Sequence, residues 1–190
     1  MKSLILASQS PRRHQLLEQV NIPFSVVPSA VEEIVDNNLS PADIAMSLAK
    51  QKADEVFNNH PKSVVIGADT IVVANDKILE KPSNTQEAYD MLQLLSGDSH
   101  SVVTGVTINS DENNVTFFEE TIVHFYPLTQ EEIEMYVESG EPFDKAGAYG
   151  IQGLGAALVK KIEGDYFAVV GLPIAKVVRV LKKFQIFQSN

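Results

Sequence analysis

Two arginines stand where a helix is expected to begin. Ser10 and Pro11 are residue types that favour an N-cap and a first helical position, and Arg12 and Arg13 follow directly. The N-terminus of a helix carries partial positive charge, so acidic residues are favoured there. A phosphate would relieve the repulsion, because it accepts hydrogen bonds from the unpaired N–H groups of the first turn and from guanidinium groups. The segment therefore indicates a phosphate site, and a solvated basic turn is the alternative.

A second expected helix of the same chain starts in the ordinary way. Ser40 and Pro41 are followed by Asp43, whose carboxylate suits the positive end of a helix. The chain thus places an acidic residue where only a helix has to begin. This contrast favours the interpretation of the two arginines as one half of a site for an anion.

The carboxylate of Asp69 interrupts the most apolar strand candidate, residues 63–73. A carboxylate between buried β-branched runs has a large desolvation cost unless a cation, a water molecule or a lysine offsets it. Gly67, just before it, permits a bulge or a close approach of another backbone. An aspartate that caps a loop is one interpretation, and a catalytic base or metal ligand is the other.

Further charged residues supply what phosphoanhydride hydrolysis needs: positive charge on the phosphates, carboxylates for a metal and a base for water. Glu32 and Glu33 end an extended stretch, and Lys50 and Lys52 lie on one expected helix. Lys81 precedes a proline. Each lysine taken alone is more typical of solvated surface.

A glycine-rich segment follows near residues 144–156, and it matches neither the GxxxxGK[ST] nor the GxGxxG phosphate loop. Closely spaced glycines still allow a backbone to approach a flat ligand. Gln152 within it offers both a donor and an acceptor, which suits the edge of a base. A flexible turn is the alternative.

Composition excludes several classes of protein. The net charge is −10 without a long basic block, which argues against nucleic-acid binding. The absence of cysteine excludes disulfides and thiolate sites, and the four histidines lack zinc-binding spacing. No apolar run approaches the length of a membrane span, so we expect no membrane segment and a cytoplasmic protein.

The hydrophobic pattern predicts strands that alternate with helices. Strands or extended stretches are expected at residues 3–8, 24–35, 63–73, 77–82, 100–110 and 115–128, with a later hairpin that turns at Glu163 and Gly164. Helices are expected at residues 11–20, from 41 past 56, at 85–95, from 129 to near 140, and at 173–184. Because several strand pairs are expected to be hairpins, the sheet should be mixed rather than wholly parallel.

These features, in this order, resemble the Maf family of nucleoside triphosphate pyrophosphatases. The matching segments are LILASQSPRR at 4–13, Glu32 and Glu33, AKQKA at 49–53, IGADTIV at 66–72, LEKP at 79–82, LSG at 95–97, DKAGAYGIQG at 144–153 and VVGLP at 169–173. The resemblance implies an α/β fold similar to that of inosine triphosphatase relatives (Maf/Ham1). That fold has a twisted mixed sheet flanked by helices, in two lobes around a central cleft. It also implies a single Maf domain over residues 1–190.

The resemblance further implies hydrolysis of dTTP and UTP, with modified pyrimidine triphosphates as further substrates, to the monophosphate and pyrophosphate, with Mg²⁺ or Mn²⁺. Asp69 is the implied proton acceptor, Glu33 and Lys81 complete the catalytic set, and Glu33 with Asp69 would hold the metal. The implied substrate-binding residues are Ser8, Ser10, Arg12, Arg13, Lys52, Thr70 and Gln152, of which Arg12, Thr70 and Gln152 mark the dTTP/UTP subgroup.

The resemblance leaves a second function open, a nucleotide-binding regulator of cell division (a septum-formation inhibitor) with little turnover. The expected partner is a small nucleoside triphosphate in either case, and a homodimer is the assembly that the resemblance implies.

Overall fold

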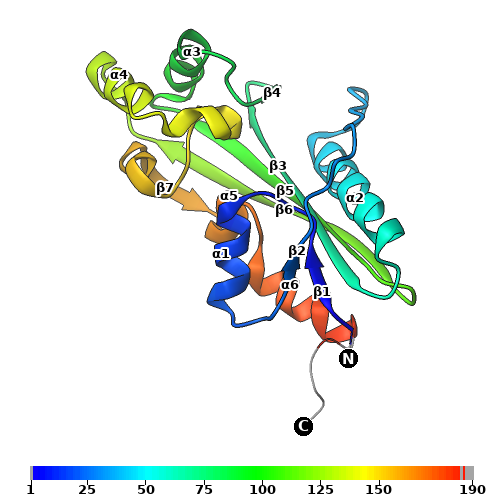
Figure 1. The fold of residues 1–190 in the computed structure, drawn as a ribbon. Coiled ribbons are helices and arrows are strands. Elements are labelled where there is room, and N and C mark those ends of the chain that lie inside the picture. The colour runs from blue at the N-terminus through cyan, green and yellow to red at the C-terminus, as the bar shows by residue number, and fades with distance from the viewer. Residues whose placement is uncertain (1, 185, 187–190) are drawn as a thin grey trace. The chain divides into compact units, whose positions relative to one another are not determined.

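A mixed sheet with helices beside it is the framework of the fold (Figure 1). This computed structural model describes residues 2–184 and 186. Its strands are β1 (Leu4–Leu6), β2 (Ser25–Val26), β3 (Val64–Ala74), β4 (Lys77–Leu79), β5 (Ser99–Asn109), β6 (Asn114–Phe125) and β7 (Val159–Glu163). Along the sheet the order is β2-β1-β3-β5-β6-β7, and β4 pairs with β3. β1 is parallel to β2 and β3, whereas β3–β4 and β6–β7 are antiparallel, so the mixed α/β sheet is confirmed.

Except for α5, the helices below begin close to the residues that the sequence indicates. They are α1 (Pro11–Gln19), α2 (Pro41–Asn59), α3 (Thr85–Leu95), α4 (Gln130–Glu138), α5 (Tyr166–Val170) and α6 (Ile174–Leu181). Local capping explains several starts. Thr129 and Glu132 form a capping box at the start of α4, and the Asn84 side chain accepts a hydrogen bond from Glu87 N–H at the start of α3. Within the described residues, no helix is both long and apolar enough to cross a membrane.

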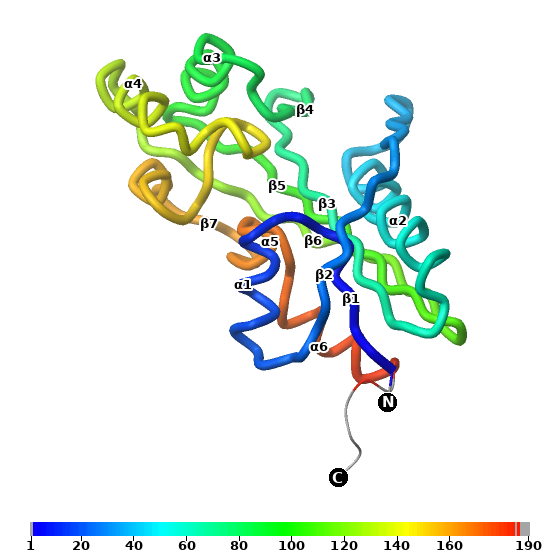
Figure 2. The backbone as a smooth tube through the Cα atoms, in the orientation of Figure 1, coloured from blue at the N-terminus to red at the C-terminus, as the bar shows by residue number. Residues whose placement is uncertain are grey.

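The chain divides into two compact units, as the expected lobes require. Unit 1 comprises residues 2–69, 104–119 and the described residues from 171 onward. Unit 2 comprises Thr70–Val103 and Glu120–Val170. The start of the chain, blue in Figure 2, and the red α6 both belong to unit 1. The cleft expected between the lobes stays a prediction.

In unit 1, α2 approaches the sheet closely at two glycines. A Cβ atom on Gly67 of β3 would lie 2.3 Å from the carbonyl oxygen of Ala49. One on Gly105 of β5 would lie 2.3 Å from that of Ala45. Glycine is therefore required at both contacts. Because side chains alternate along a strand, Asp69 lies on the same face of β3 as Gly67, the face that α2 covers.

Unit 2 has its own apolar core, in which His100 of β5 is buried among aromatic rings. The rings of Phe125 and Tyr149 stand edge-on to each other and to His100, with centroids 4.7–5.2 Å apart. His100 Nε2 lies 2.7 Å from the Tyr149 hydroxyl oxygen. Burial lowers the pKa of His100 to about 4 and raises the pKa of Tyr149. The glycine-rich segment runs over this unit as short 3₁₀ turns, Glu141–Asp144, Ala146–Ala148 and Gly153–Leu158.

Two expectations differ from the structure. The hairpin expected to turn at Glu163 and Gly164 is wrong in its second half, because α5 follows and β7 pairs instead with β6. The side chain of Asp165 accepts a hydrogen bond from Phe167 N–H, 2.8 Å away, and so begins a helix at this point. The extended stretch at 24–35 forms strand only at Ser25–Val26, since β1 offers just two paired positions there.

Candidate active site

The turn between β1 and α1 is built around the hydroxyl group of Ser8. Ser8 is buried, and its Oγ accepts hydrogen bonds from Ser10 N–H at 3.2 Å and from Arg13 Nη1 at 3.3 Å. The carbonyl oxygen of Ser8 accepts a further hydrogen bond from His14 Nε2 at 2.8 Å. The sequence did not predict this contact of His14. Hydrogen bonds within unit 1 therefore hold the turn in place, and they come from residues at the expected phosphate site.

Ser10 does not cap α1 with its side chain. Ser40, in contrast, caps α2 by accepting a hydrogen bond from Asp43 N–H at 3.2 Å. The first turn of α1 also contains no acidic residue. Its N–H groups are therefore not satisfied by an N-cap side chain, as the phosphate interpretation requires.

The second of the two arginines that follow, Arg13, is held by the backbone of a distant segment of unit 1. Arg13 is half-buried, and its Nε donates a hydrogen bond to the carbonyl oxygen of Gly171 at 2.7 Å. Burial lowers the pKa of Arg13, while the charge of Asp69 raises it and that of Arg12 lowers it. The Arg13 guanidinium is thus fixed by the backbone and lies within the electric field of Asp69. The role of Gly171 had no signal in the sequence beyond the matching VVGLP segment.

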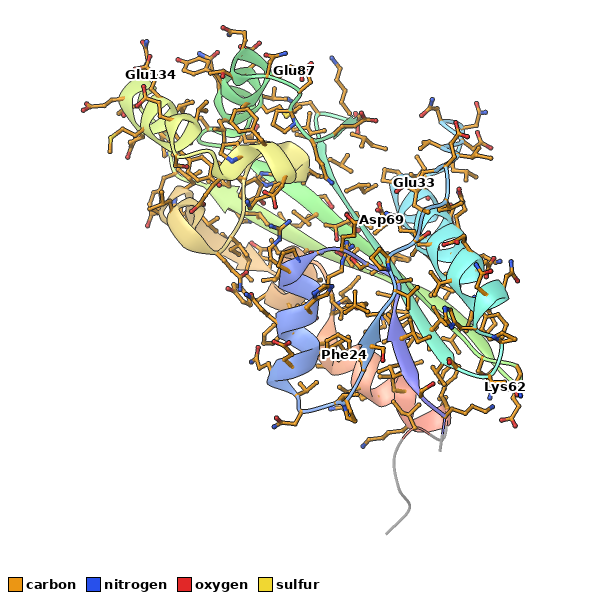
Figure 3. All side chains as sticks on the ribbon, viewed as in Figure 1. Phe24, Glu33, Lys62, Asp69, Glu87 and Glu134 are labelled. Atoms are coloured by element: carbon orange, nitrogen blue, oxygen red, sulfur yellow. The ribbon has the colours of Figure 1, made fainter. Side chains whose placement is uncertain are left out.

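The ammonium group of Lys52 in α2 forms ion pairs with the two predicted metal ligands, Asp69 and Glu33. Its Nζ lies 2.5 Å from Asp69 Oδ1 and 3.0 Å from Glu33 Oε1. The side chains of Lys52 and Asp69 are 17% and 14% exposed, whereas that of Glu33 is 43% exposed. Figure 3 labels both carboxylates, which lie near each other beside α2. The lysine that the sequence placed among phosphate-binding residues therefore contacts the candidate base directly.

The register of the parallel strands explains why these groups meet. Leu6 pairs with Ile66, and Ala7 N–H donates to the carbonyl oxygen of Ile66 at 2.8 Å. Ser8 and Asp69 both follow this last paired position. Ligands of open α/β sheets bind at the carboxyl ends of parallel strands. Ser8 follows the carboxyl end of β1, and Asp69 lies within β3 just beyond its parallel pairing with β1.

The remaining predicted residues belong to unit 2. Thr70, the first residue of unit 2, is half-buried. Lys81, which follows Glu80 in the chain, is exposed. The carbonyl oxygen of Glu80 accepts a hydrogen bond from Gly147 N–H at 3.1 Å, so the chain next to Lys81 is tied to the glycine-rich segment. Gln152 is half-buried, and its side chain makes no hydrogen bond to another described residue. Its amide donor and acceptor therefore remain available to a ligand.

Two side chains, Tyr136 and Glu141, make hydrogen bonds to the backbone of the glycine-rich segment. The carboxylate of Glu141 accepts hydrogen bonds from Leu154 N–H at 3.0 Å and from Gly155 N–H at 3.4 Å. The hydroxyl oxygen of Tyr136 accepts one from Gly150 N–H at 3.1 Å. Sequence reasoning missed both anchors, since neither has a motif or a spacing that marks it. They fix the backbone on both sides of Gln152.

The predicted metal ligands Glu33 and Asp69 form a site of two carboxylates. The described residues contain no group of three or more His, Cys, Asp or Glu side chains arranged to hold a metal ion. Mg²⁺ is commonly bound by one or two carboxylates together with substrate phosphates and water. Two carboxylate oxygens that already share one cation, the Lys52 ammonium, fit that role.

The fold and this site define an α/β protein in which an uncapped helix N-terminus and a pair of carboxylates belong to the same unit. The chain belongs to the Maf-like protein family, whose model matches residues 3–184. The family that the sequence motifs resemble is thereby confirmed.

Several curated relatives align over nearly the whole chain. The chain is 59% identical over 186 residues to a dTTP/UTP pyrophosphatase of Bacillus cereus (strain G9842), covering 98% of this chain and 97% of that protein. It is 58% identical over 184 residues to a dTTP/UTP pyrophosphatase of Bacillus cytotoxicus, covering 97% of this chain and 96% of that protein. It is 56% identical over 186 residues to that of Bacillus pumilus (strain SAFR-032), covering 98% of each. A solved structure from Vibrio cholerae, with 14% identity, a TM-score of 0.36 and coverage of 73% of this chain and 71% of that one, is too dissimilar to add to the argument.

Proposed function

We propose that this chain is a nucleoside triphosphate pyrophosphatase that hydrolyses dTTP and UTP to the monophosphate and pyrophosphate. The observation that carries the proposal is the placement of Asp69, paired with Lys52, in the same unit as the turn from Ser8 to Arg13. This arrangement combines a candidate base, positive charge and an uncapped helix N-terminus. The printed names of the relatives support the choice of substrates.

The helix start binds the phosphates in this proposal. The first-turn N–H groups of α1 and the hydroxyl of Ser10 donate to phosphate oxygens, since neither is taken by an N-cap. Arg13 presents the rest of its guanidinium fork while its Nε stays on Gly171. Positioning by groups that are already fixed lowers the entropic cost of binding a flexible triphosphate.

Asp69 acts as the proton acceptor. It takes a proton from a water molecule whose oxygen forms a bond to phosphorus at the α–β linkage. The P–O bond to pyrophosphate then breaks, and the negative charge passes to the leaving group. Lys52 and Lys81 stabilise that charge.

A divalent cation, Mg²⁺ or Mn²⁺, held by Glu33 and Asp69 together with the phosphates, would supply further neutralisation of phosphate charge. Arg12, Thr70 and Gln152 select the nucleotide in this proposal. Support for Gln152 comes from its amide, which makes no hydrogen bond to another described residue, on a backbone anchored by Glu141. The single domain over residues 1–190, the homodimer, the cytoplasmic location and the lack of nucleic-acid binding stay predictions.

A screen for pyrophosphate release tests the proposal. The purified chain is given natural and modified nucleoside triphosphates, with Mg²⁺, with Mn²⁺ and with chelator. We expect dTTP and UTP to be the preferred natural substrates and the chelator to stop the reaction. Tight nucleotide binding without pyrophosphate release would overturn the proposal and favour the regulatory function.

A further inference from the structure

A single ammonium group, that of Lys52, contacts both carboxylates of the unit 1 site, Asp69 and Glu33. We propose that Lys52 is a built-in counter-cation that competes with a divalent cation for Asp69 and Glu33. The chain without nucleotide then binds the cation weakly, and binding tightens once phosphates offer Lys52 another anionic partner. The inference rests on the proposed function for the divalent cation at Glu33 and Asp69 and for the identity of those phosphates.

The burial of the pair supports this role. Lys52 and Asp69 are largely shielded from water, at 17% and 14% side-chain exposure. A carboxylate in such a place needs a cation, because desolvation disfavours an isolated charge. A lysine ammonium has three donors, of which Asp69 and Glu33 occupy two. A divalent cation between the same oxygens would therefore have to displace the lysine.

The backbone on both sides of the ion pairs is fixed, so their geometry is not that of an accidental surface contact. The contact of Gly67 with Ala49 and Ala53 sets the distance from α2 to β3. The loop that carries Glu33 is held on the same helix by Gln51, one residue before Lys52. Gln51 accepts a hydrogen bond from Ile34 N–H at 2.9 Å and donates one to the carbonyl oxygen of Ile34 at 2.8 Å.

A competition of this kind couples two ligands. If phosphates draw the ammonium of Lys52 away from the carboxylates, nucleotide raises the affinity for the cation. By thermodynamic linkage, the cation raises the affinity for nucleotide by the same factor. The site would then select the cation–nucleotide complex over either component alone.

The test measures Mn²⁺ binding to the nucleotide-free protein by electron paramagnetic resonance. Lys52→Met should bind Mn²⁺ at least tenfold more tightly than the wild type, a gain of about 1.4 kcal/mol. Lys50→Met is the matched control, because Lys50 lies on the same helix but pairs with Asp54. It removes the same charge and should change the affinity by less than about twofold, as expected for a screened charge. Equal or weaker Mn²⁺ binding by Lys52→Met would overturn the proposal.

Two further measurements complete the experiment. The double variant Lys52→Met/Asp69→Asn should lose the gained affinity, and retention of the gain would place the Mn²⁺ elsewhere and overturn the proposal. Should Lys52→Met not fold, Lys52→Gln replaces it in the same titration, with the same outcomes. Since no nucleotide is present, a failure here is distinguishable from a failure of pyrophosphate release.

Discussion

Arg13 Nε donates a hydrogen bond to the carbonyl oxygen of Gly171, 2.7 Å away, and so joins residues separated by 158 positions. This bond leaves the remaining nitrogens of a planar fork at the start of α1, with Nη1 on Ser8 Oγ. Arginine is needed for such an arrangement because lysine has neither the fork nor the Nε donor.

Replacement of each arginine by lysine should therefore have a different effect on the kinetics. Arg13→Lys should lower kcat/KM at least tenfold on dTTP and UTP alike, since it removes a phosphate contact and its backbone anchor. Arg12→Lys should instead change the ratio of the two rates to those for other triphosphates. Steady-state kinetics on four triphosphates measures both effects. Parallel losses in the two variants would contradict the separation of their roles.

The two Ser-Pro helix starts offer a second contrast. Ser40→Ala removes a hydrogen bond to Asp43 N–H and should cost about 1 kcal/mol of unfolding free energy, with pyrophosphate release unchanged. Ser10→Ala removes no cap and should leave stability within about 0.5 kcal/mol while lowering kcat/KM. Urea unfolding and kinetics on the same samples check the pair. An unstable but active Ser10→Ala would show that Ser10 is a structural cap.

Glu141 should act on catalysis through the segment that carries Gln152. Glu141→Gln loses a charged acceptor of two backbone N–H groups, and such bonds contribute about 1.5–3 kcal/mol. We expect KM for dTTP and UTP to rise more than kcat falls. Glu138→Gln removes the same charge from the exposed end of α4 and is the control. A loss confined to kcat would contradict a positioning role for Glu141.

His100 predicts a dependence of stability on pH. Burial holds the pKa of His100 at about 4, against about 6.5 in an unfolded chain, so unfolding takes up a proton between these values. The free energy of unfolding is unaffected by this protonation above pH 6.5. It decreases as the pH falls from 6.5 toward 4, with a slope of up to about 1.4 kcal/mol per pH unit. Urea unfolding of wild type and His100→Gln at pH 7, 6 and 5 measures it. An identical slope in the variant would show that His100 does not titrate on unfolding.

Local chemistry explains why much of the fold follows from the sequence. Caps are encoded within a few residues, so the starts of α3 and α4 could be predicted. α5 could not be predicted, because an apolar run of five residues fits a strand or a helix equally well.

The candidate site also contains some residues that the sequence predicts and others that it does not. Ser8, Arg13 and Asp69 could be proposed because each breaks a local rule or matches a family motif. The anchors Gly171 and Glu141 could not, because their roles come from contacts made across the fold. No spacing in the chain encodes that Lys52 Nζ reaches Asp69 and Glu33 together.

In the proposed pyrophosphatase reaction, the carboxylate of Asp69 accepts the proton. The most direct measurement is pyrophosphate release from dTTP by wild type and Asp69→Asn, with the unfolding transition of both recorded. We predict a loss of at least a thousandfold in kcat with a cooperative transition retained. Near-normal pyrophosphate release by Asp69→Asn would show that Asp69 is not the proton acceptor.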